Sequence, residues 1–224
     1  MPPGRNPEDD PRYQRTRRAL LDALLELAAQ RPSMTVSVSE LTSRAGVSRS
    51  SFYAHAASPA DLLADHLIAS LSPHLDRLGT VLSDEPERFQ ERTREIYVDL
   101  LREVQVDRDV YVHVFAESGT GMVLARLRGR FRQASEAFVG DLVRHLAQDP
   151  GELWVGMAAA QHSSSLIIMI DSWLAAGADR SAEDVVDTYL SLAPPWQLVR
   201  LDERGLASIG RHRVLRRDHQ VGAG

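Results

Sequence analysis

The chain of 224 residues contains no cysteine and no lysine, and few of its residues are aromatic. Without cysteine it cannot form disulfides, thiolate metal sites, iron–sulfur clusters or a cysteine nucleophile. Its apolar runs are shorter than the ~18 residues of a membrane-spanning helix, and its first residues lack the apolar core of a secretory signal. We therefore expect a cytoplasmic protein. Because every basic residue is arginine, contacts with phosphate would come from arginines, hydroxyls, amides or helix termini.

The charges are distributed unevenly along the chain. Hydrophobic residues make up 43% and charged residues 25%, which is ordinary for a globular protein, and the net charge is −5. Residues 11–57 contain seven arginines and three acids, whereas residues 58–200 contain 13 arginines and 22 acids. The basic segment suits a contact with DNA, with the acidic remainder held away from it. An ordinary solvated charge pattern is the alternative reading.

The hydrophobic pattern predicts an all-α fold. Leucines at 20, 24 and 27 form the stripe of a core-facing helix, and Asp10 and Pro11 suit its start. Pro73 should kink or end a helix that opens at Ser58. No alternating strand pattern stands out. The predicted helices span 11–30, 38–45, 48–55, 58 to about 75, 87–103, 109–117, 122–148, 150–176 and 182–192.

Local capping signals predict a helix-turn-helix between residues 37 and 55. Ser37 and Glu40 match a capping box, Gly46 suits the left-handed end of a short helix, and Ser48 caps the next one. The second helix of such a motif enters the major groove of DNA, and its first residues meet base edges. Arginine reads guanine, serine meets bases or phosphates, and tyrosine offers a ring and a hydroxyl. The predicted DNA contacts are Ser37, Thr42, Ser48, Arg49, Ser50, Ser51, Tyr53 and His55.

The stretch AGVSRSSFYAHAASPADLL, residues 45–63, resembles the DNA-binding segment of the TetR family of bacterial transcriptional regulators. Matches to the family pattern are Ala45, Gly46, Val47, Ser48, Tyr53, His55 and Leu62. Departures are Ala56 in place of phenylalanine, Pro59 in place of the lysine that opens the fourth helix, and Thr42 in place of a smaller residue. The lost lysine removes an expected phosphate contact. The chain resembles a divergent member.

The resemblance implies an N-terminal three-helix helix-turn-helix DNA-binding domain and a larger helical ligand-binding and dimerisation domain. The expected divisions are a flexible tail at 1–10, the DNA-binding domain at 11–57, the body at 58–193 and a C-terminal tail at 194–224. Such a protein binds a palindromic operator as a homodimer, most often as a repressor, and a small-molecule effector releases it. The alternative is a helical dimer that binds a ligand or a protein and lacks sequence-specific DNA binding.

The resemblance also places a pocket and a dimer interface in the body. The expected pocket residues are Tyr97, Tyr111, His113, Phe115, Met122, Trp154, Met157, Gln161 and His162. Each of them would equally suit a helical core, and the two histidines suit core positions with satisfied hydrogen bonds. In the family the last two long helices pair between subunits, although the helix at 154–176 would also suit the centre of a monomer. The expected interface residues are Gly156, Ala160, Ser164, Ile167, Ile170, Trp173, Leu174, Val186 and Tyr189.

No catalytic constellation accompanies these features. Metalloprotease, nucleophile-elbow and phosphate-loop motifs are absent from the sequence, so we expect neither an enzyme nor a cofactor or metal. The C-terminal tail carries five arginines beyond residue 200, namely Arg204, Arg211, Arg213, Arg216 and Arg217. We read this tail either as an additional arm for DNA or an interface, or as a loosely packed end. Trp196 and Leu198 are the residues expected to attach this segment to the body.

Overall fold

The computed structural model describes residues 10–116, 121–177, 180–200 and 206–207. They form helices with no strand among them, apart from one isolated parallel bridge between Leu146 and Ala207, so the predicted all-α class is confirmed. Short 3-10 turns lie at Ser33–Thr35, Pro86–Arg88 and Pro195–Leu198. The α-helices are α1 (Pro11–Ala28), α2 (Val38–Ala45), α3 (Arg49–Tyr53), α4 (Pro59–Leu78), α5 (Val81–Asp84), α6 (Phe89–Val106), α7 (Arg108–Ala116), α8 (Met122–Arg144), α9 (Glu152–Ala175) and α10 (Ala182–Leu192).

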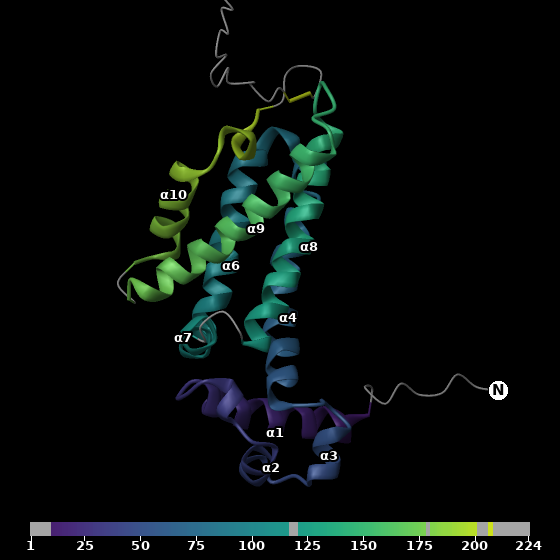
Figure 1. Cartoon of the computed structure of the whole chain (residues 1–224), viewed down its shortest axis with the longest axis vertical. Helices are drawn as coiled ribbons and strands as arrows, with labels where there is room; N and C mark the ends of the chain where they lie inside the picture. Colours follow the sequence, from purple (N-terminus) through teal and green to yellow (C-terminus); the bar gives the residue numbers. More distant parts are fainter. Residues whose placement is uncertain (1–9, 117–120, 178–179, 201–205, 208–224) are drawn as a thin grey trace, which may run out of the picture.

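The first three helices form a small unit at one end of the molecule (Figure 1). Asp10 caps α1 by accepting a hydrogen bond from the Arg12 amide at 2.8 Å, as the sequence indicated. Leu20, Leu24 and Leu27 of α1 are buried, and α1 packs against α2 and α4. The predicted stripe is therefore the core of this unit.

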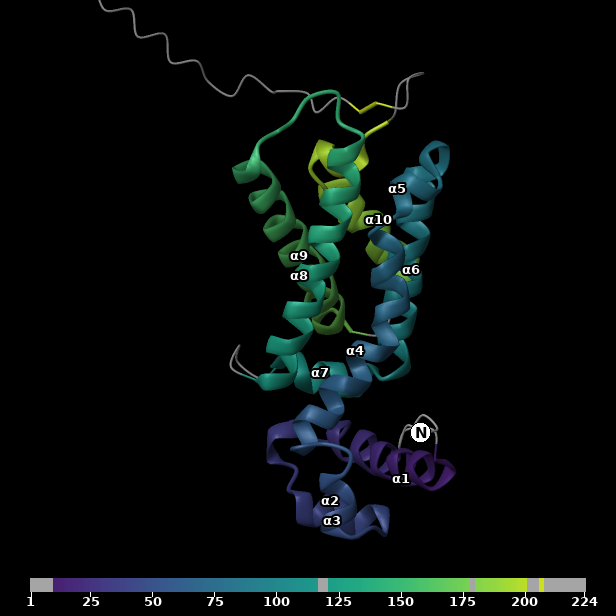
Figure 2. The same ribbon diagram turned by 90° about the vertical axis from the view of Figure 1, so that its right-hand side faces the viewer.

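Helix α4 joins the small unit to the body (Figures 1 and 2). It starts at the predicted cap, where the Ser58 hydroxyl accepts a hydrogen bond from the Asp61 amide at 3.1 Å. The helix does not end at Pro73 but continues to Leu78. Leu71, Leu75 and Leu78, on either side of this proline, are all buried and form one continuous apolar face. The packing of this face offsets the loss of the backbone hydrogen bond that proline cannot donate.

The body is built on α4, α6, α8 and α9, with α7 lying across its end nearest the small unit (Figures 1 and 2). Phe131 and Phe138 of α8 are fully buried at its centre. Helix α5, which the sequence did not predict, is capped from a distance. The buried Asp141 carboxylate on α8 accepts hydrogen bonds from the amides of Leu82 at 2.9 Å and Ser83 at 3.1 Å. A carboxylate thus satisfies amides that have no partner within the helix.

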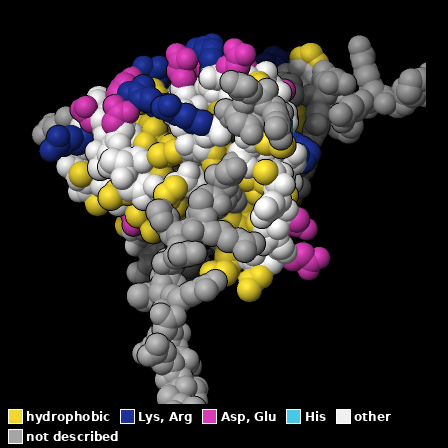
Figure 3. All heavy atoms as spheres, turned by 90° about the horizontal axis from the view of Figure 1, so that it is seen from above, with side chains coloured by type: hydrophobic (Ala, Val, Ile, Leu, Met, Phe, Trp, Pro, Cys, Tyr) yellow, Lys and Arg dark blue, Asp and Glu magenta, His cyan; other side chains and the backbone are white. Residues whose placement is uncertain are grey.

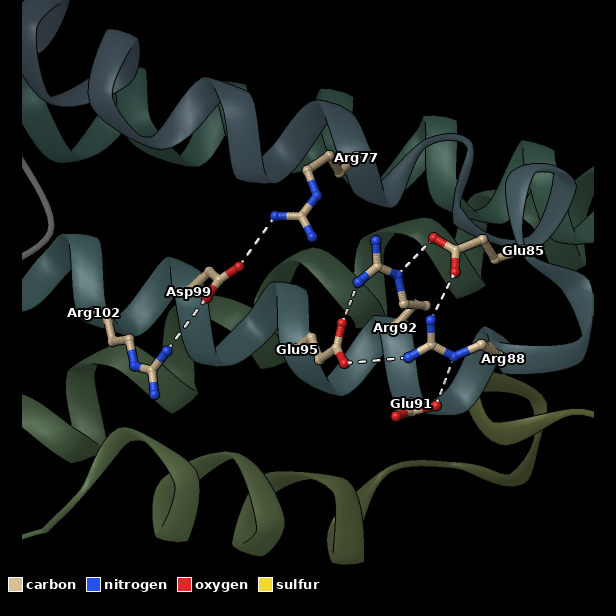
Figure 4. A network of polar contacts seen from close by, with 8 residues as sticks. All are labelled: Arg77, Glu85, Arg88, Glu91, Arg92, Glu95, Asp99 and Arg102. Atoms are coloured by element: carbon tan, nitrogen blue, oxygen red, sulfur yellow. Dashed lines mark hydrogen bonds and ion pairs between the residues drawn. The ribbon is translucent and has the colours of Figure 1, made fainter.

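Arginine–carboxylate pairs tie α4, α6 and the turn before α6 together (Figure 4). The Arg77 guanidinium of α4 lies 3.1 Å from Asp99 of α6, and Arg102 lies on the other side of the same carboxylate. Around the start of α6, Arg88 and Arg92 each contact Glu85 and Glu95. These pairs are largely exposed to solvent, so each contributes little to stability, and they act chiefly by fixing geometry.

The far end of the body carries the described part of the C-terminal segment. Trp196 is buried, and the Gln90 side chain donates a hydrogen bond to the Leu198 carbonyl at 2.6 Å, so the predicted attachment at these two residues is confirmed. Seen from this end, charged side chains gather along one edge, and hydrophobic side chains form separate patches away from it (Figure 3). The five arginines beyond residue 200 lie outside the described residues.

Helix α9 is the most apolar long helix of the described residues. By length and composition it would cross a membrane, but such a helix is also typical of a soluble core, and α9 packs along α8. Its exposed side retains large apolar residues, Leu153, Met157 and Ile168. One side of α9 is therefore an exposed apolar surface.

Candidate nucleic-acid interface

Helices α2 and α3 meet at the tight turn that the capping signals predicted. The Ser37 hydroxyl accepts a hydrogen bond from the Glu40 amide at 3.2 Å, and Gly46 ends α2 with a φ of 67°. The Ser48 hydroxyl accepts from the Ser51 amide at 3.0 Å and starts α3. Each boundary thus depends on contacts within three or four residues, which is why the sequence alone located it.

Helix α3 lies at the end of the molecule farthest from the body (Figures 1 and 2), and it carries exposed polar side chains. Tyr53 is 61% exposed, and Arg49 and Ser50 are exposed as well, whereas Phe52 between them is fully buried. Phe52 therefore fixes how α3 is rotated. The exposed face carries a guanidinium, hydroxyls and a phenol, which are the groups that read base edges and phosphates in a major groove.

Thr42 is not a member of that face. It is only 4% exposed, and its hydroxyl donates to the carbonyls of Val38 at 2.8 Å and Ser39 at 3.2 Å. The predicted DNA contact at Thr42 is therefore corrected, because a helix with one buried face leaves this position inside. Its hydroxyl is satisfied within α2, which explains how this position tolerates threonine.

His55 lies just beyond α3, which ends at Tyr53 rather than at residue 55 as predicted. Its ring packs on Tyr13 of α1 with centroids 3.9 Å apart. Burial, and next the positive charge of Arg17, lower the pKa of His55. The imidazole thus joins α3 to the start of α1, and its role in DNA contact remains a proposal.

The sequence reasoning missed the first turns of α1 as part of this surface. Tyr13 and Arg17 lie beside His55, so the first half of α1 lies next to the end of α3. Two other arginines of the domain are already neutralised: Arg31 pairs with Glu40, and Arg44 pairs with Glu26 at 2.6 Å. Arg17 and Arg49 have no ion-pair partner among the residues that the structure describes. Their free charges favour phosphate. The signal in the sequence was the run of arginines at 12, 15, 17 and 18.

Among the residues that the structure describes, the predicted pocket residues are scattered between core and surface. Tyr97, Tyr111 and His162 are fully buried in the core, Trp154, His113 and Phe115 are half-buried, and Met122 and Met157 are exposed. Gln161 lines a cleft between α9 and α10. The aromatic residues at helical spacing are thus core residues, because close helix packing fills the space that a pocket would need.

A chain of buried hydrogen bonds crosses this core. The Tyr97 hydroxyl lies 2.7 Å from Nε2 of His162, and Nδ1 of His162 lies 2.9 Å from the Ser135 hydroxyl. Burial lowers the pKa of His162 to about 3, so the ring is neutral at pH 7. Burial also raises the pKa of Tyr97. Three neutral side chains therefore join α6, α8 and α9.

The predicted interface residues separate into two groups. Gly156 and Ser164 are exposed and Ala160, Ile167 and Tyr189 are half-buried, so these can contact another molecule. Ile170, Trp173, Leu174 and Val186 are buried within the single chain, and their assignment to an interface is corrected. Helix α9 has apolar residues both on the side that packs in the core and on the side exposed to solvent. Its sequence alone therefore did not show which residues are buried.

Helices α2 and α3 with the turn at Gly46 form a helix-turn-helix, the arrangement whose second helix contacts the major groove in DNA-binding proteins. Residues 20–65 match the family model for the bacterial regulatory proteins of the tetR family. The match is confined to the N-terminal helices α1 to α3 and the start of α4. Among curated protein sequences, none matches the chain.

Solved structures show the same overall fold at low sequence identity. NalD of Pseudomonas aeruginosa, the secondary repressor of the MexAB-OprM multidrug efflux pump, has 17% identity and a TM-score of 0.57 over 87% of this chain and 96% of its own. The fatty acid degradation regulator FadR of Bacillus halodurans has 15% identity and a TM-score of 0.55 over 82% and 95%. The dihydroxyacetone kinase operon activator DhaS has 14% identity and a TM-score of 0.52 over 79% and 93%.

Proposed function

We propose that this protein binds a palindromic operator as a homodimer in the cytoplasm, represses transcription there, and is released by a small-molecule effector. The observation that carries the proposal is the α3 face, on which Arg49 and Tyr53 are exposed while Phe52 is buried. A two-fold dimer would place its two α3 helices in major grooves about 34 Å apart. NalD is described as a repressor and DhaS as an activator, so proteins of this fold regulate in both directions. The position of the operator relative to the promoter would decide which direction applies here.

The dimer is proposed to form through the exposed side of α9. The small residues Gly156, Ala160 and Ser164 recur every four positions, and Met157 beside them is 65% exposed. Shallow hollows along α8 and α9 border this stripe. Small side chains let a second helix approach closely, and the exposed apolar residues supply area to bury.

Release by an effector requires that movement in the body reaches α3. Helix α4 supplies the connection, because Arg126 of α8 bonds to Asp65 of α4 at 2.7 Å near the start of that helix. A ligand that favours one position of α8 and α4 would change the distance between the two α3 helices. Operator affinity then falls if the ligand prefers the distance that fits the operator poorly.

In vitro selection from random duplex DNA tests the proposed DNA binding. The wild type should enrich an inverted repeat, and Arg49→Ala and Tyr53→Ala should each bind it roughly ten- to a hundredfold more weakly. Met34→Ala is the matched control, since Met34 is exposed in the same domain but lies outside α3. A folded, dimeric protein that enriches no sequence would instead support the ligand- or protein-binding module that lacks DNA recognition.

Sedimentation velocity tests the dimer. Ser164→Arg should give monomers, because it places a charge within the small-residue stripe of α9. Gln105→Arg, on an exposed position at the end of α6, should leave the dimer intact. If Ser164→Arg sediments as the wild type does, the partner does not pack on this face.

A further inference from the structure

The small unit of α1 to α3 meets the body at two places. The first is α4, which runs on into the body and is bonded near its start to Arg126 of α8. The second is the corner where α6 ends and α7 begins, because α7 packs against α1 and also against α9. Domains joined by a small contact move relative to each other, so a unit held along one helix can pivot about it. A second contact away from that helix removes this freedom.

Two consecutive side chains at the corner reach different helices. Asp107 follows α6, and its Oδ2 lies 3.3 Å from Nε2 of His66 on α4. Arg108 begins α7, and its Nη2 donates a hydrogen bond to the Leu174 carbonyl in the last turn of α9 at 3.1 Å. The same guanidinium lies over the ring of Trp173, 5.4 Å from the ring centroid. Neighbours in the chain thus link α4 to α9.

The contacts of Arg108 fix geometry more than they favour folding. The carbonyls at the end of α9 lack partners within the helix and form the negative end of its dipole, so a cation is held there and on the aromatic face. Yet Nη1 of Arg108 is buried without a partner in the part of the chain that the structure describes. A buried donor without an acceptor disfavours the folded state. What arginine adds at this position is a directed bond to the end of α9.

Apolar packing beside the corner is incomplete. A hollow of about 290 Å³ lies between Leu25 and Ala29 of α1 and residues 105–110. Val106, the last residue of α6, is 73% exposed. Close packing normally fixes how helices sit on one another, and this constraint is weak on the side of the corner that faces α1. The polar contacts of Asp107 and Arg108 therefore carry more of the positioning.

We propose that Arg108 is a positioning residue. It holds the α6–α7 corner on the end of α9, Asp107 holds the same corner on α4, and together they fix the orientation of the small unit on the body. This joint lies within one chain. Its consequence for DNA rests on the proposed function: in a dimer joined through α9, Arg108 would set the separation of the two α3 helices and so the spacing of the half-sites.

A distance between two spin labels in the full-length protein tests the joint without DNA. The chain has no cysteine, so Met34→Cys between α1 and α2 and Asp84→Cys at the end of α5 place labels at two exposed positions only. Dilution with unlabelled chain restricts the measurement to the distance within one chain. The labelled wild type should give one narrow distribution, and Arg108→Met should broaden or shift it. An unchanged distribution would overturn the proposal.

Two further variants separate positioning from folding. Arg88→Met removes an exposed guanidinium at the start of α6, away from the corner, and should leave the distance distribution as in the wild type. Arg108→Met should unfold within about 3 °C of the wild type, because the lost contacts include a buried donor without an acceptor. If Arg108→Met does not fold, Asp107→Ala serves instead, since that side chain is 22% exposed and its loss breaks only the contact with α4. A narrow, unshifted distribution in Asp107→Ala would equally contradict the joint.

Operator duplexes with altered half-site spacing test the consequence for DNA. One added or removed base pair should weaken wild-type binding by about tenfold, and binding by Arg108→Met by about threefold or less, because a loosely held unit adapts to either spacing. Both proteins should bind an isolated half-site equally well. An altered label distance with an unchanged spacing preference would support the joint and contradict its effect on the operator. A wild type that enriches no operator contradicts the proposed function, whereas the label distances still decide the joint.

Discussion

The Tyr97 hydroxyl lies 2.7 Å from Nε2 of His162 in a part of the core that excludes water, and this contact joins α6 to α9. The same imidazole lies stacked on Phe138 with centroids 4.5 Å apart. Burial therefore favours the neutral ring, and protonation would place a charge between an aromatic face and two hydroxyls. The interior of the body should consequently be sensitive to acid.

Acidification should destabilise the wild type more than His162→Gln. The pKa of His162 is lowered to about 3 in the folded protein, from 6.5 in the unfolded chain. Between these values the unfolded chain binds a proton that the folded chain does not, so the free energy of unfolding falls as the pH falls. From pH 7 to pH 5 the wild type should lose about 2 kcal/mol more than the variant, measured by urea unfolding. Parallel losses in the two proteins would show that His162 is not the acid-sensitive group.

Replacing Asp141 by asparagine should destabilise the fold by roughly 2–4 kcal/mol. The buried carboxylate accepts from the amides of Leu82 and Ser83, and an asparagine NH₂ group turned toward either amide would leave a donor unpaired. Glu136→Gln on the exposed side of α8 is the matched control and should change stability by less than ~0.5 kcal/mol. The midpoints of thermal unfolding of the two variants provide the measurement. If Asp141→Asn and Glu136→Gln unfold at the same temperature, Asp141 does not act as a cap of α5.

Gly46→Ala should lower the free energy of unfolding by ~1–2 kcal/mol, because residue 46 has a φ of 67° that an alanine adopts only with strain. Gly140→Ala is the opposite control. It lies within α8, nothing lies within 4 Å of the added Cβ, and helix propensity favours alanine by up to ~1 kcal/mol. Melting temperatures should thus move in opposite directions. A neutral Gly46→Ala would mean that the turn between α2 and α3 is not constrained as described.

Arg17→Ala should reduce the steepness with which DNA affinity depends on salt. If Arg17 neutralises one phosphate, the slope of log affinity against log salt should become shallower by about 1. Arg88→Ala removes the same charge at the start of α6, at the other end of the molecule, and should leave the slope unchanged (Figure 2). Fluorescence anisotropy of a labelled duplex at several salt concentrations provides the measurement. Identical slopes for Arg17→Ala and the wild type would exclude the start of α1 from the interface.

Local chemistry determined much of this protein from its sequence. The caps at Asp10, Ser37, Ser48 and Ser58 and the glycine turn depend on contacts within four residues, so their positions could be predicted one by one. The stripe of leucines in α1 likewise required only the helical period. With the TetR resemblance, these features were sufficient for the fold class and for the exposed face of α3.

Tertiary structure alone decided the remainder. Asp141 caps α5 from 58 and 59 residues away, and Tyr97 meets His162 across 65 positions, so no local pattern signals either contact. The buried side of Thr42, the inward face of α9 and the cleft beside Gln197 follow from which helices pack together. Burial and partnership are properties of the packed helices, because an apolar or polar side chain has the same sequence neighbours whether it faces the core or solvent.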